Sequence, residues 1–419
     1  MGSLHSLEVK GKLYRLLYKM NERVNIRVKT PVGMSEAKET YDVVAQGSVK
    51  AALVSSANLG VGVEDKFKES DKENLYYDIK LLPQSYMDDV IRCSENVQNA
   101  QHGNDLMEEM IKEKVLEFNI GKSNYTIIGN KKARKNLRDK LSKCPLKLCG
   151  EEMEEKKSIK YLGEIISCNL EESVHETVSK RIGIAKHCFI ELRTVIEDSR
   201  CDKLGGINTA IEIFNLSILP AVLYNAKTWQ NIPKRTYRAL THFFNSFYQC
   251  IFRCCSGTPI ANYYWETASI RVENIILQKK STFFFHHLAH LPEDSLAGEF
   301  FQLQVERNIS GLVTEMNEHI QILGNPNPKN VSKGIWKRKI DSYITKKNKN
   351  DVLNDIRKYK KLDFEELSKE KFERKSYLYE LNLENARMFK IKVRLFEPLG
   401  RISLKSMRKS LFHASHAKI

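Results

Sequence analysis

The stretch Tyr86-Met87-Asp88-Asp89-Val90 lies between two short apolar segments, residues 79–85 and a second segment that opens at Val90-Ile91. Two adjacent carboxylates inside a strand-like run are unusual, because aspartate is depleted in strands and favoured in tight turns. The stretch therefore predicts a β-hairpin with the two aspartates at its tip. Two carboxylates held this close together can bind a hard divalent cation such as Mg²⁺ through their oxygen atoms.

The sequence around this stretch predicts a mixture of helices and strands. Residues 24–28 alternate between polar and apolar side chains with a period of two, which is typical of a strand. Apolar residues between 106 and 118 recur at helical spacing, and Gly121 is suited to end that helix. Residues 125–128 predict a short strand, and residues 159–166 predict another strand that turns at Gly163.

The tripeptide Gln46-Gly47-Ser48 precedes residues 49–59, which are rich in alanine and serine and predict a closely packed helix. A glycine in front of such a helix lets a substrate approach the backbone closely. The same three residues also form a common turn, so a purely structural role is the alternative.

Four short motifs follow one another along the chain: Gln46-Gly47-Ser48, Tyr86-Met87-Asp88-Asp89, Gly121-Lys122 and Tyr161-Leu162-Gly163. The pattern Tyr-x-Asp-Asp resembles the catalytic motif of reverse transcriptases, and the order of the four motifs resembles that of the later palm motifs in these polymerases. Residues 17–21 and 28–33 are also similar to the segment ahead of the Gln-Gly motif in the enzymes of non-LTR retrotransposons. Over about residues 10–400 the chain therefore resembles a reverse transcriptase of the non-LTR type.

This resemblance implies an RNA-directed DNA polymerase that adds nucleotides by a two-metal mechanism. It implies that Asp88 and Asp89 bind Mg²⁺ or Mn²⁺, and that Lys122 contacts or protonates the leaving pyrophosphate. The residues implied in template, nucleotide and primer contacts are Gln46, Gly47, Ser48, Tyr86, Tyr161, Leu162 and Gly163. The implied partners are an RNA template, a DNA primer and deoxynucleoside triphosphates. For Lys122, a solvated lysine after a helix end is the alternative.

A two-metal site of this kind needs a further aspartate from an earlier strand, because the ions require oxygen ligands from opposite sides. The resemblance places that aspartate upstream of the helix predicted over residues 13–20, yet Glu8 is the only acidic residue among the first 21. We therefore expect an N-terminally truncated enzyme that is weak or inactive by itself. The alternative is a catalytically inactive nucleic-acid-binding relic of a retrotransposon protein.

The sequence becomes helical from about residue 171 onward. Apolar residues repeat at steps of three and four over residues 174–196, which predicts a long amphipathic helix. Residues 211–219, ahead of Pro220, and residues 240–252 predict two more helices, which by the resemblance form a thumb. The predicted fold class is α+β, with a polymerase palm remnant, a helical thumb and a basic helical C-terminal region. The predicted boundaries are 1–166 for partial fingers and palm, 167–260 for the thumb, 261–328 for a helical connection and 329–419 for the basic region.

Basic charge is concentrated at the C-terminal end of the chain. The formal net charge is +16, and residues 329–419 hold 25 basic against 11 acidic residues, a net charge of +14. Basic clusters there are interleaved with Trp336, Tyr343 and Tyr359, and aromatic rings beside cations are typical of contacts to single-stranded nucleic acid. A polyanion is the expected partner of this region, and a solvated helical surface is the alternative.

Cysteine usage and hydropathy favour an intracellular protein, in the nucleus or the cytoplasm. The 9 cysteines are odd in number and lack the dense spacing of a small secreted domain. No run of about 18 apolar residues occurs, so no membrane span is expected. His286, His287 and His290, with cysteines upstream, fit no familiar zinc spacing, and their aromatic neighbours favour packing instead.

Overall fold

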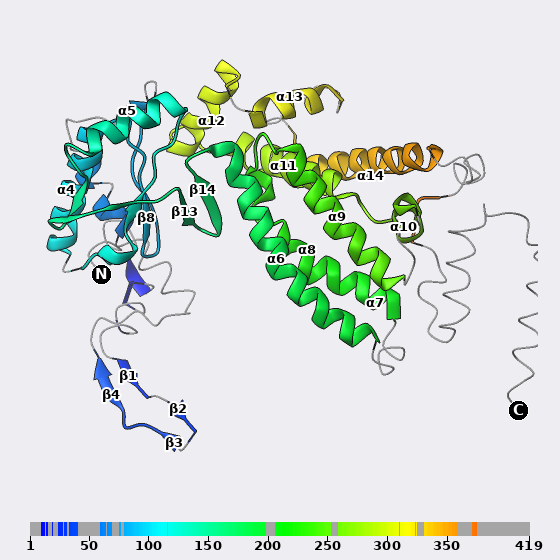
Figure 1. Ribbon diagram of the computed structural model, residues 1–419, viewed down its shortest axis with the longest axis horizontal. Helices are drawn as coiled ribbons and strands as arrows, with labels where there is room; N and C mark the ends of the chain where they lie inside the picture. Colours follow the sequence, from blue (N-terminus) through cyan, green and yellow to red (C-terminus); the bar gives the residue numbers. More distant parts are fainter. Residues whose placement is uncertain are drawn as a thin grey trace, which may run out of the picture. The chain divides into compact units, whose positions relative to one another are not determined.

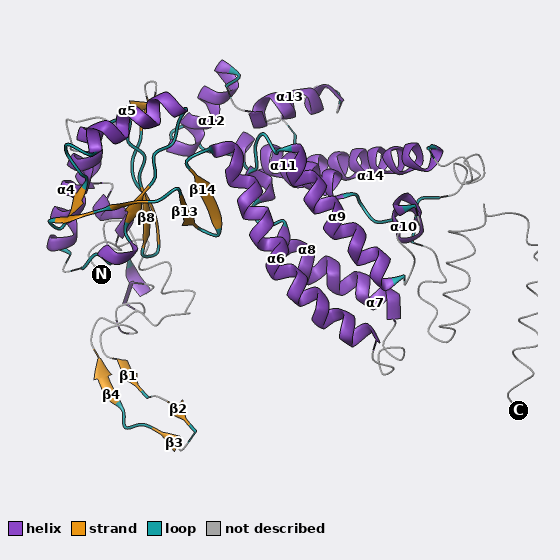
Figure 2. Ribbon diagram, in the orientation of Figure 1, coloured by secondary structure: helices purple, strands orange, loops and turns teal. Residues whose placement is uncertain are grey.

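The computed structural model describes residues 10–40, 59–68, 75–197, 206–252, 259–324, 331–358 and 371–374, with short gaps inside some of these ranges (Figure 1). The chain forms two compact units, Met1–Leu170 and Glu171–Ile419. Figure 2 shows that the strands belong to the first unit, whereas the described residues of the second form helices and their connections. The chain is thus of mixed helix and strand, which agrees with the predicted α+β class.

Strands of the first unit are short, and each described strand pairs with one other strand. The antiparallel pairs are β1 (Val24–Ile26) with β4 (Lys38–Thr40), β2 (Lys29–Thr30) with β3 (Gly33–Met34), β5 (Leu75–Tyr76) with β6 (Ile79–Lys80), β7 (Gln84–Tyr86) with β8 (Asp89–Ile91), β10 (Lys147–Leu148) with β11 (Glu151–Glu152), and β13 (Ser158–Tyr161) with β14 (Glu164–Ser167). The pair of β9 (Asn124–Tyr125) with β12 (Glu154–Glu155) is parallel. Strands are confirmed within the predicted segments 24–28 and 159–166, whereas the strand predicted over residues 125–128 is Asn124–Tyr125 and residues 126–128 are not in a strand.

Two helices cover the apolar sides of these strands. Helix α4 (Val97–Glu113) begins at Asn96, whose side chain accepts a hydrogen bond of 2.8 Å from the amide of Asn99. Its buried residues Met107, Met110 and Ile111 join one core cluster together with Leu59, Val63 and Phe67, whereas Val97 belongs to a second cluster. Helix α5 (Lys131–Leu141) buries Leu141 in that second cluster, and its lysines are exposed, whereas Arg134 is half-buried and donates to the Sγ of Cys168 at 2.9 Å.

The predicted helix over residues 106–118 was misplaced, because the helix starts at Val97 and ends at Glu113. The polar residues before Leu106 do not show an apolar stripe, so periodicity alone missed the first half. Phe118 packs against the same core from the connection that follows the helix. Phe118 continues the helical spacing of the apolar residues before it, although its own backbone is not helical. Gly121 lies further on, in the 3-10 turn η1 (Ile120–Lys122), and does not end the helix.

The second unit is built from helices α6 (Leu170–Glu197), α7 (Gly206–Ile213), α8 (Leu219–Val222), α9 (Lys234–Ile251), α10 (Ile260–Thr267), α11 (Val272–His286), α12 (Leu296–Arg307), α13 (Gly311–Ile322) and α14 (Lys333–Arg357). Short 3-10 turns, η4 (Ala226–Thr228) and η5 (Leu288–His290), lie between them. The long amphipathic helix predicted over residues 174–196 is confirmed as α6.

Stacked aromatic rings fill the first core of this helical unit. Phe214 lies 3.8 Å from Phe247 between ring centroids and meets Phe244 edge to face at 5.3 Å. Phe214 opens a π-helical segment, η3 (Phe214–Ile218), which joins α7 to α8. The helix therefore does not end before Pro220, as predicted, but continues through it. Proline has no N–H to donate to the carbonyl four positions earlier, so the regular α-helical bond is absent at Pro220. The wider π-helical turn just before Pro220 lets the helix continue without that bond.

Helix α14 belongs to two cores at once. Its first half buries Trp336 against Phe285, with the rings stacked at 4.2 Å, in the second core cluster of the helical unit. Its second half buries Val352 and Ile356 in the first cluster. The basic segment after residue 328 therefore packs within the helical unit through this helix. In the described part of the chain, no helix is both long enough and apolar enough to cross a membrane.

Candidate functional site

The Tyr86-Met87-Asp88-Asp89 motif forms the predicted β-hairpin. Tyr86 at the end of β7 pairs with Asp89 at the start of β8. Met87 and Asp88 form the two-residue turn, and Met87 has a φ of 56°, as tight hairpin turns require. Asp88 thus lies at the tip, whereas Asp89 is the first residue of the second strand.

Strand alternation directs the aspartates away from the core. Val90 lies next to Asp89 on the strand, so the two side chains point to opposite faces. Val90 packs against the core cluster of the first unit that contains Met107, Met110 and Ile111. Tyr86 is directly opposite Asp89 and shares its face, where it is 51% exposed. Asp88 and Asp89 are both exposed, so their carboxylates are accessible to a metal ion or to a substrate.

A second hairpin of the same design carries Tyr161-Leu162-Gly163. Tyr161 of β13 pairs with Glu164 of β14, and Leu162 and Gly163 form the turn with φ values of 46° and 80°. Ile165 on β14 is buried. The two motifs therefore share one local structure, an exposed two-residue turn whose strands hold an apolar residue inward.

The two hairpins meet through Tyr161. Its hydroxyl donates to the carbonyl oxygen of Gln84 on β7 at 3.5 Å, which is at the long end of the hydrogen-bond range. Burial of the ring, followed by the negative charge of Asp89, raises the pKa of Tyr161 above its ordinary value. Two segments that are 77 residues apart thus come together at the aspartate hairpin. Sequence reasoning missed Gln84, because its contribution is a backbone carbonyl.

Lys122 is exposed at the end of the 3-10 turn η1. Its carbonyl oxygen accepts a hydrogen bond of 2.7 Å from the side chain of Asn124. Among the described residues, no hydrogen bond or ion pair joins Lys122 to Asp88 or Asp89. The structure therefore brings Tyr161 to the hairpin but not Lys122. Gln46, Gly47 and Ser48 lie outside the described residues.

The donor chemistry of the hairpin fits Mg²⁺ in part. Carboxylate oxygens are the hard ligands that Mg²⁺ prefers, and Asp88 and Asp89 supply them from adjacent positions. Across the residues that the structure describes, however, no group of three His, Cys, Asp or Glu side chains could hold a metal ion. The two carboxylates of the hairpin could therefore hold a metal ion only together with a further oxygen ligand from another segment.

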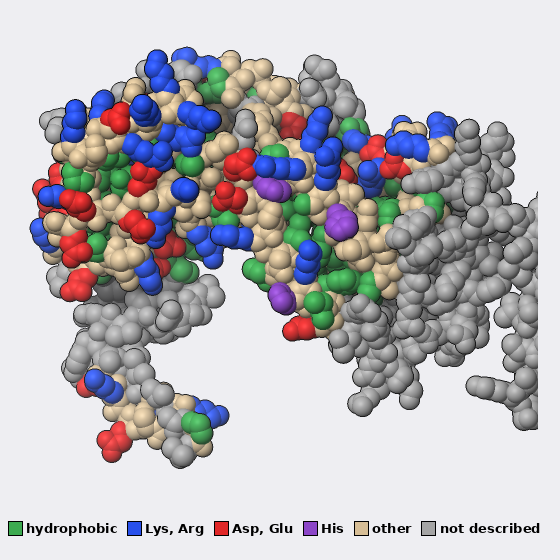
Figure 3. Space-filling model, viewed as in Figure 1, with side chains coloured by type: hydrophobic (Ala, Val, Ile, Leu, Met, Phe, Trp, Pro, Cys, Tyr) green, Lys and Arg blue, Asp and Glu red, His purple; other side chains and the backbone are tan. Residues whose placement is uncertain are grey.

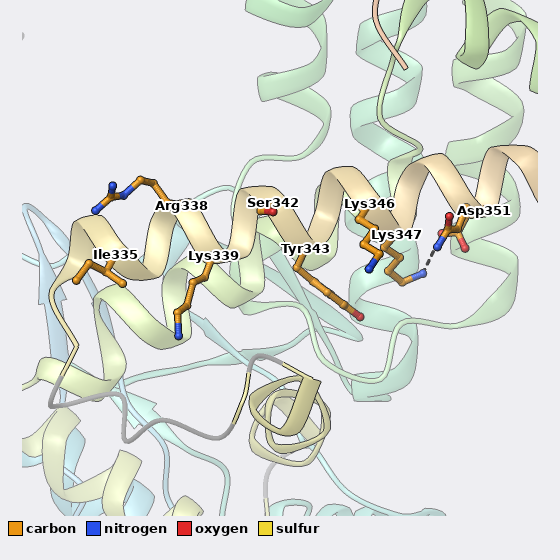
Figure 4. A pocket seen from close by; sticks show the side chains of 9 residues that line it. Ile335, Arg338, Lys339, Ser342, Tyr343, Lys346, Lys347 and Asp351 are labelled. Carbon is orange, nitrogen blue, oxygen red and sulfur yellow. Dashed lines mark hydrogen bonds and ion pairs between the residues drawn. The ribbon is translucent and has the colours of Figure 1, made fainter. Parts of the chain in front are cut away.

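A second candidate site lies on α14. Figure 3 shows Lys and Arg side chains on the surface over α5 and over α14. On α14, Arg338, Lys339, Tyr343, Lys346 and Lys347 line one open hollow of about 820 Å³ (Figure 4). These side chains share a face because they are spaced at three, four, seven and eight residues. That spacing is visible in the sequence and could have identified the face.

The predicted role of Trp336 beside these cations is wrong. Trp336 is fully buried in the second core cluster, so its ring is not available to stack on a base. Tyr343 is half-buried: it packs against the same core cluster and also lines the hollow, and Tyr359 lies outside the described residues. The aromatic ring that could serve a nucleic acid on this helix is therefore Tyr343.

The histidines considered for zinc lie in a packed region. Phe284 and Phe285 beside them are buried, and Phe283 lies 5.9 Å from the ring of His287. Burial lowers the pKa of His286 below its ordinary value.

No protein-family model matches the chain, and a search of curated proteins finds none that matches it.

Proposed function

We propose that the chain carries the palm and thumb of an RNA-directed DNA polymerase of reverse-transcriptase type. The observation that supports this proposal is the contact between two hairpins, one presenting Asp88 and Asp89 and the other presenting Tyr161. Both motifs were identified from their order in the sequence, and the Tyr161 side chain of one reaches the backbone of the strand that leads into the other, at Gln84.

In this proposal Asp88 and Asp89 would hold Mg²⁺ or Mn²⁺ on the exposed face of the hairpin. The metal, when bound, supplies activation of the primer 3′ hydroxyl and neutralisation of the triphosphate. Tyr86 lies on the same face as Asp89 and contacts the nucleotide or the template. Gln46, Gly47 and Ser48 line the template side, and Lys122 contacts the leaving pyrophosphate.

The tip of the second hairpin grips the primer. Leu162 is 36% exposed there, a large apolar side chain at a turn, and is suited to contact the sugars and bases of a bound strand. Tyr161 fixes this tip against β7. RNA template, DNA primer and deoxynucleoside triphosphates are the partners in this proposal, and the nucleus or the cytoplasm is the compartment.

A second candidate function is nucleic-acid binding without catalysis. It is favoured by the basic face of α14 and by the two carboxylates of the hairpin, which are fewer than a two-metal site uses. Primer extension on an RNA template in Mg²⁺ separates the two candidates. Asp88→Ala and Asp89→Ala are expected to reduce extension at least about a hundredfold, because a metal ion contributes several kcal/mol to the transition state.

The matched control is Asp139→Ala, which removes an exposed carboxylate from α5 in the same unit. Extension by this control should equal that of the unaltered chain. Extension that survives both hairpin substitutions rejects the assigned site. Absence of extension by the unaltered chain, with intact binding of template and primer, selects the second candidate.

A further inference from the structure

The uncovered face of α14 carries more positive than negative charge. The helix holds eight basic and three acidic side chains. Four of the basic ones, Arg338, Lys339, Lys346 and Lys347, line the hollow together with one acidic residue, Asp351. Figure 4 shows that Tyr343 lies between the two basic pairs. The face therefore presents a positive surface with an aromatic ring at its centre.

The two basic pairs lie far enough apart along the helix to contact different phosphates of one strand. The pair Arg338-Lys339 is eight residues ahead of the pair Lys346-Lys347, which is about 12 Å along a helix that rises 1.5 Å per residue. A stacked strand advances about 3.4 Å per nucleotide. The two pairs thus span three to four nucleotides, with Tyr343 placed to meet a base between them.

The pairing of these cations differs along the face. Lys347 donates to Asp351 at 2.9 Å, and Asp351 also accepts a hydrogen bond of 3.0 Å from Asn274 on α11. Among the described residues, no carboxylate forms an ion pair with Arg338, Lys339 or Lys346, and Lys339 lies 5.9 Å from the centroid of the Trp336 ring. Arg338 and Lys346 therefore have neither an acidic nor an aromatic partner among the described residues and are the cations most ready to meet an external anion.

Packing fixes which face of α14 is exposed. Trp336 is fully buried near the start of the helix, and Asn348 is fully buried near its middle. Asn348 accepts hydrogen bonds from the backbone of Arg271 and from Asn274, at 2.9 and 3.1 Å. A buried polar side chain with several partners allows one register only. The basic pairs and Tyr343 are therefore held in place before any partner binds.

The Tyr343 ring is suited to stack on a base, because a neutral phenol does not repel phosphates. Burial raises the pKa of its phenol above the ordinary value, although Lys347 acts in the opposite direction and Asp351 adds to the rise. The ring consequently stays neutral at physiological pH. A neutral aromatic ring beside cations is the arrangement that binds single strands with little sequence preference.

We infer that this face of α14 is a binding surface for single-stranded RNA, with phosphates at the two basic pairs and one base stacked on Tyr343. The inference deepens the proposed function by giving the template a contact in the second unit. It rests on that function only for the choice of RNA as the strand.

The test measures binding of a fluorescein-labelled oligouridylate to the full chain by fluorescence anisotropy over a range of salt concentrations. Neither divalent ion nor nucleoside triphosphate is present. The charge variant is Arg338→Glu with Lys346→Glu. Its matched control is Lys333→Glu with Lys337→Glu, which makes the same charge change at exposed positions of the same helix that do not line the hollow.

The charge variant should lower the slope of log affinity against log salt by about 1.4, since each phosphate contact to a single strand contributes about 0.7 to that slope. The control should leave the slope unchanged. Equal losses in both variants would overturn the inference, because binding would then follow net charge alone.

Tyr343 gives a second measurement. Tyr343→Leu keeps an apolar side chain but removes the ring, and should weaken binding about 5- to 150-fold, the usual range for one stacked base. Tyr343→Phe should bind like the unaltered chain. Full affinity of the leucine variant, or equal affinity for an RNA duplex of the same length, overturns the single-strand contact. Since the assay needs no catalysis, its failure is distinct from failure of the proposed polymerase.

Discussion

Asn348 holds α14 against α11, and its removal should destabilise the helical unit by about 3 kcal/mol. The side chain is fully buried, accepts from the backbone N–H of Arg271 and from Asn274, and donates to the carbonyl of Ser269 at 3.1 Å. In Asn348→Ala, Asn274 keeps its bond to Asp351. Two backbone groups, on Arg271 and Ser269, lose this partner.

A buried backbone group without a partner costs about 1–3 kcal/mol, so two such groups give a range of about 2–6 kcal/mol. Water that enters the space left by the side chain lowers the cost, which favours the lower half of that range. The matched control is Asn350→Ala, on the same helix but exposed. It should change the unfolding free energy by less than about 0.5 kcal/mol.

Tryptophan fluorescence during urea unfolding provides the assay. The chain has 3 tryptophans, Trp229, Trp265 and Trp336, and all lie in the second unit. The signal therefore reports unfolding of the unit that contains Asn348, and the midpoint and slope give its unfolding free energy. A loss in Asn348→Ala no larger than that in Asn350→Ala would refute the reasoning.

Two other predictions concern the same unit. Trp336→Ala should lower the unfolding free energy by about 3–5 kcal/mol, because it removes a fully buried ring stacked on Phe285. A loss of unfolding free energy below about 1.5 kcal/mol in urea unfolding would contradict this packing. Burial raises the pKa of Tyr248 from 10.0 to about 12. The folded chain thus favours the neutral phenol, so this group's contribution to stability is complete below pH 10 and falls as pH rises toward about 12. Tyr248→Phe should make unfolding less pH-dependent over that interval, and an unchanged dependence would argue against the shift.

Local signals allowed the hairpins and the long helix to be predicted. Two adjacent aspartates after a strand-like run indicate a turn, and Leu162-Gly163 places a glycine at a position with positive φ. The apolar repeat of residues 174–196 was enough to predict α6. In each case the deciding interaction lies within a few residues of sequence.

The errors arose where the deciding information was of another kind. The start of α4 is set by Asn96, an N-cap, rather than by an apolar stripe. Trp336 lies among lysines and was assigned to the surface, yet it begins a series of buried positions at steps of four that continues through Ile340 and Ile344. The prediction for Trp336 followed the charge of its neighbours and not the periodicity, although burial depends on the face of the helix.

The contact between the hairpins could not be derived from local sequence. Tyr161 reaches the carbonyl of Gln84, and a backbone carbonyl carries no sequence signal. The order of motifs suggested that the two hairpins share a site only through the resemblance to a polymerase family. Tertiary packing decides that contact, as it decides which face of α14 remains exposed.

Binding of Mn²⁺ at the hairpin tests the central proposal most directly, because it does not require the chain to be an active polymerase. Electron paramagnetic resonance counts free Mn²⁺ in a titration of the full chain with template, primer and nucleotide present. Asp88→Ala with Asp89→Ala should weaken binding at least about tenfold, the smallest loss usual when support for a metal is removed. The control Asp139→Ala should bind like the unaltered chain. Equal Mn²⁺ affinity in the hairpin variant and the control would contradict the assignment of Asp88 and Asp89 as metal ligands.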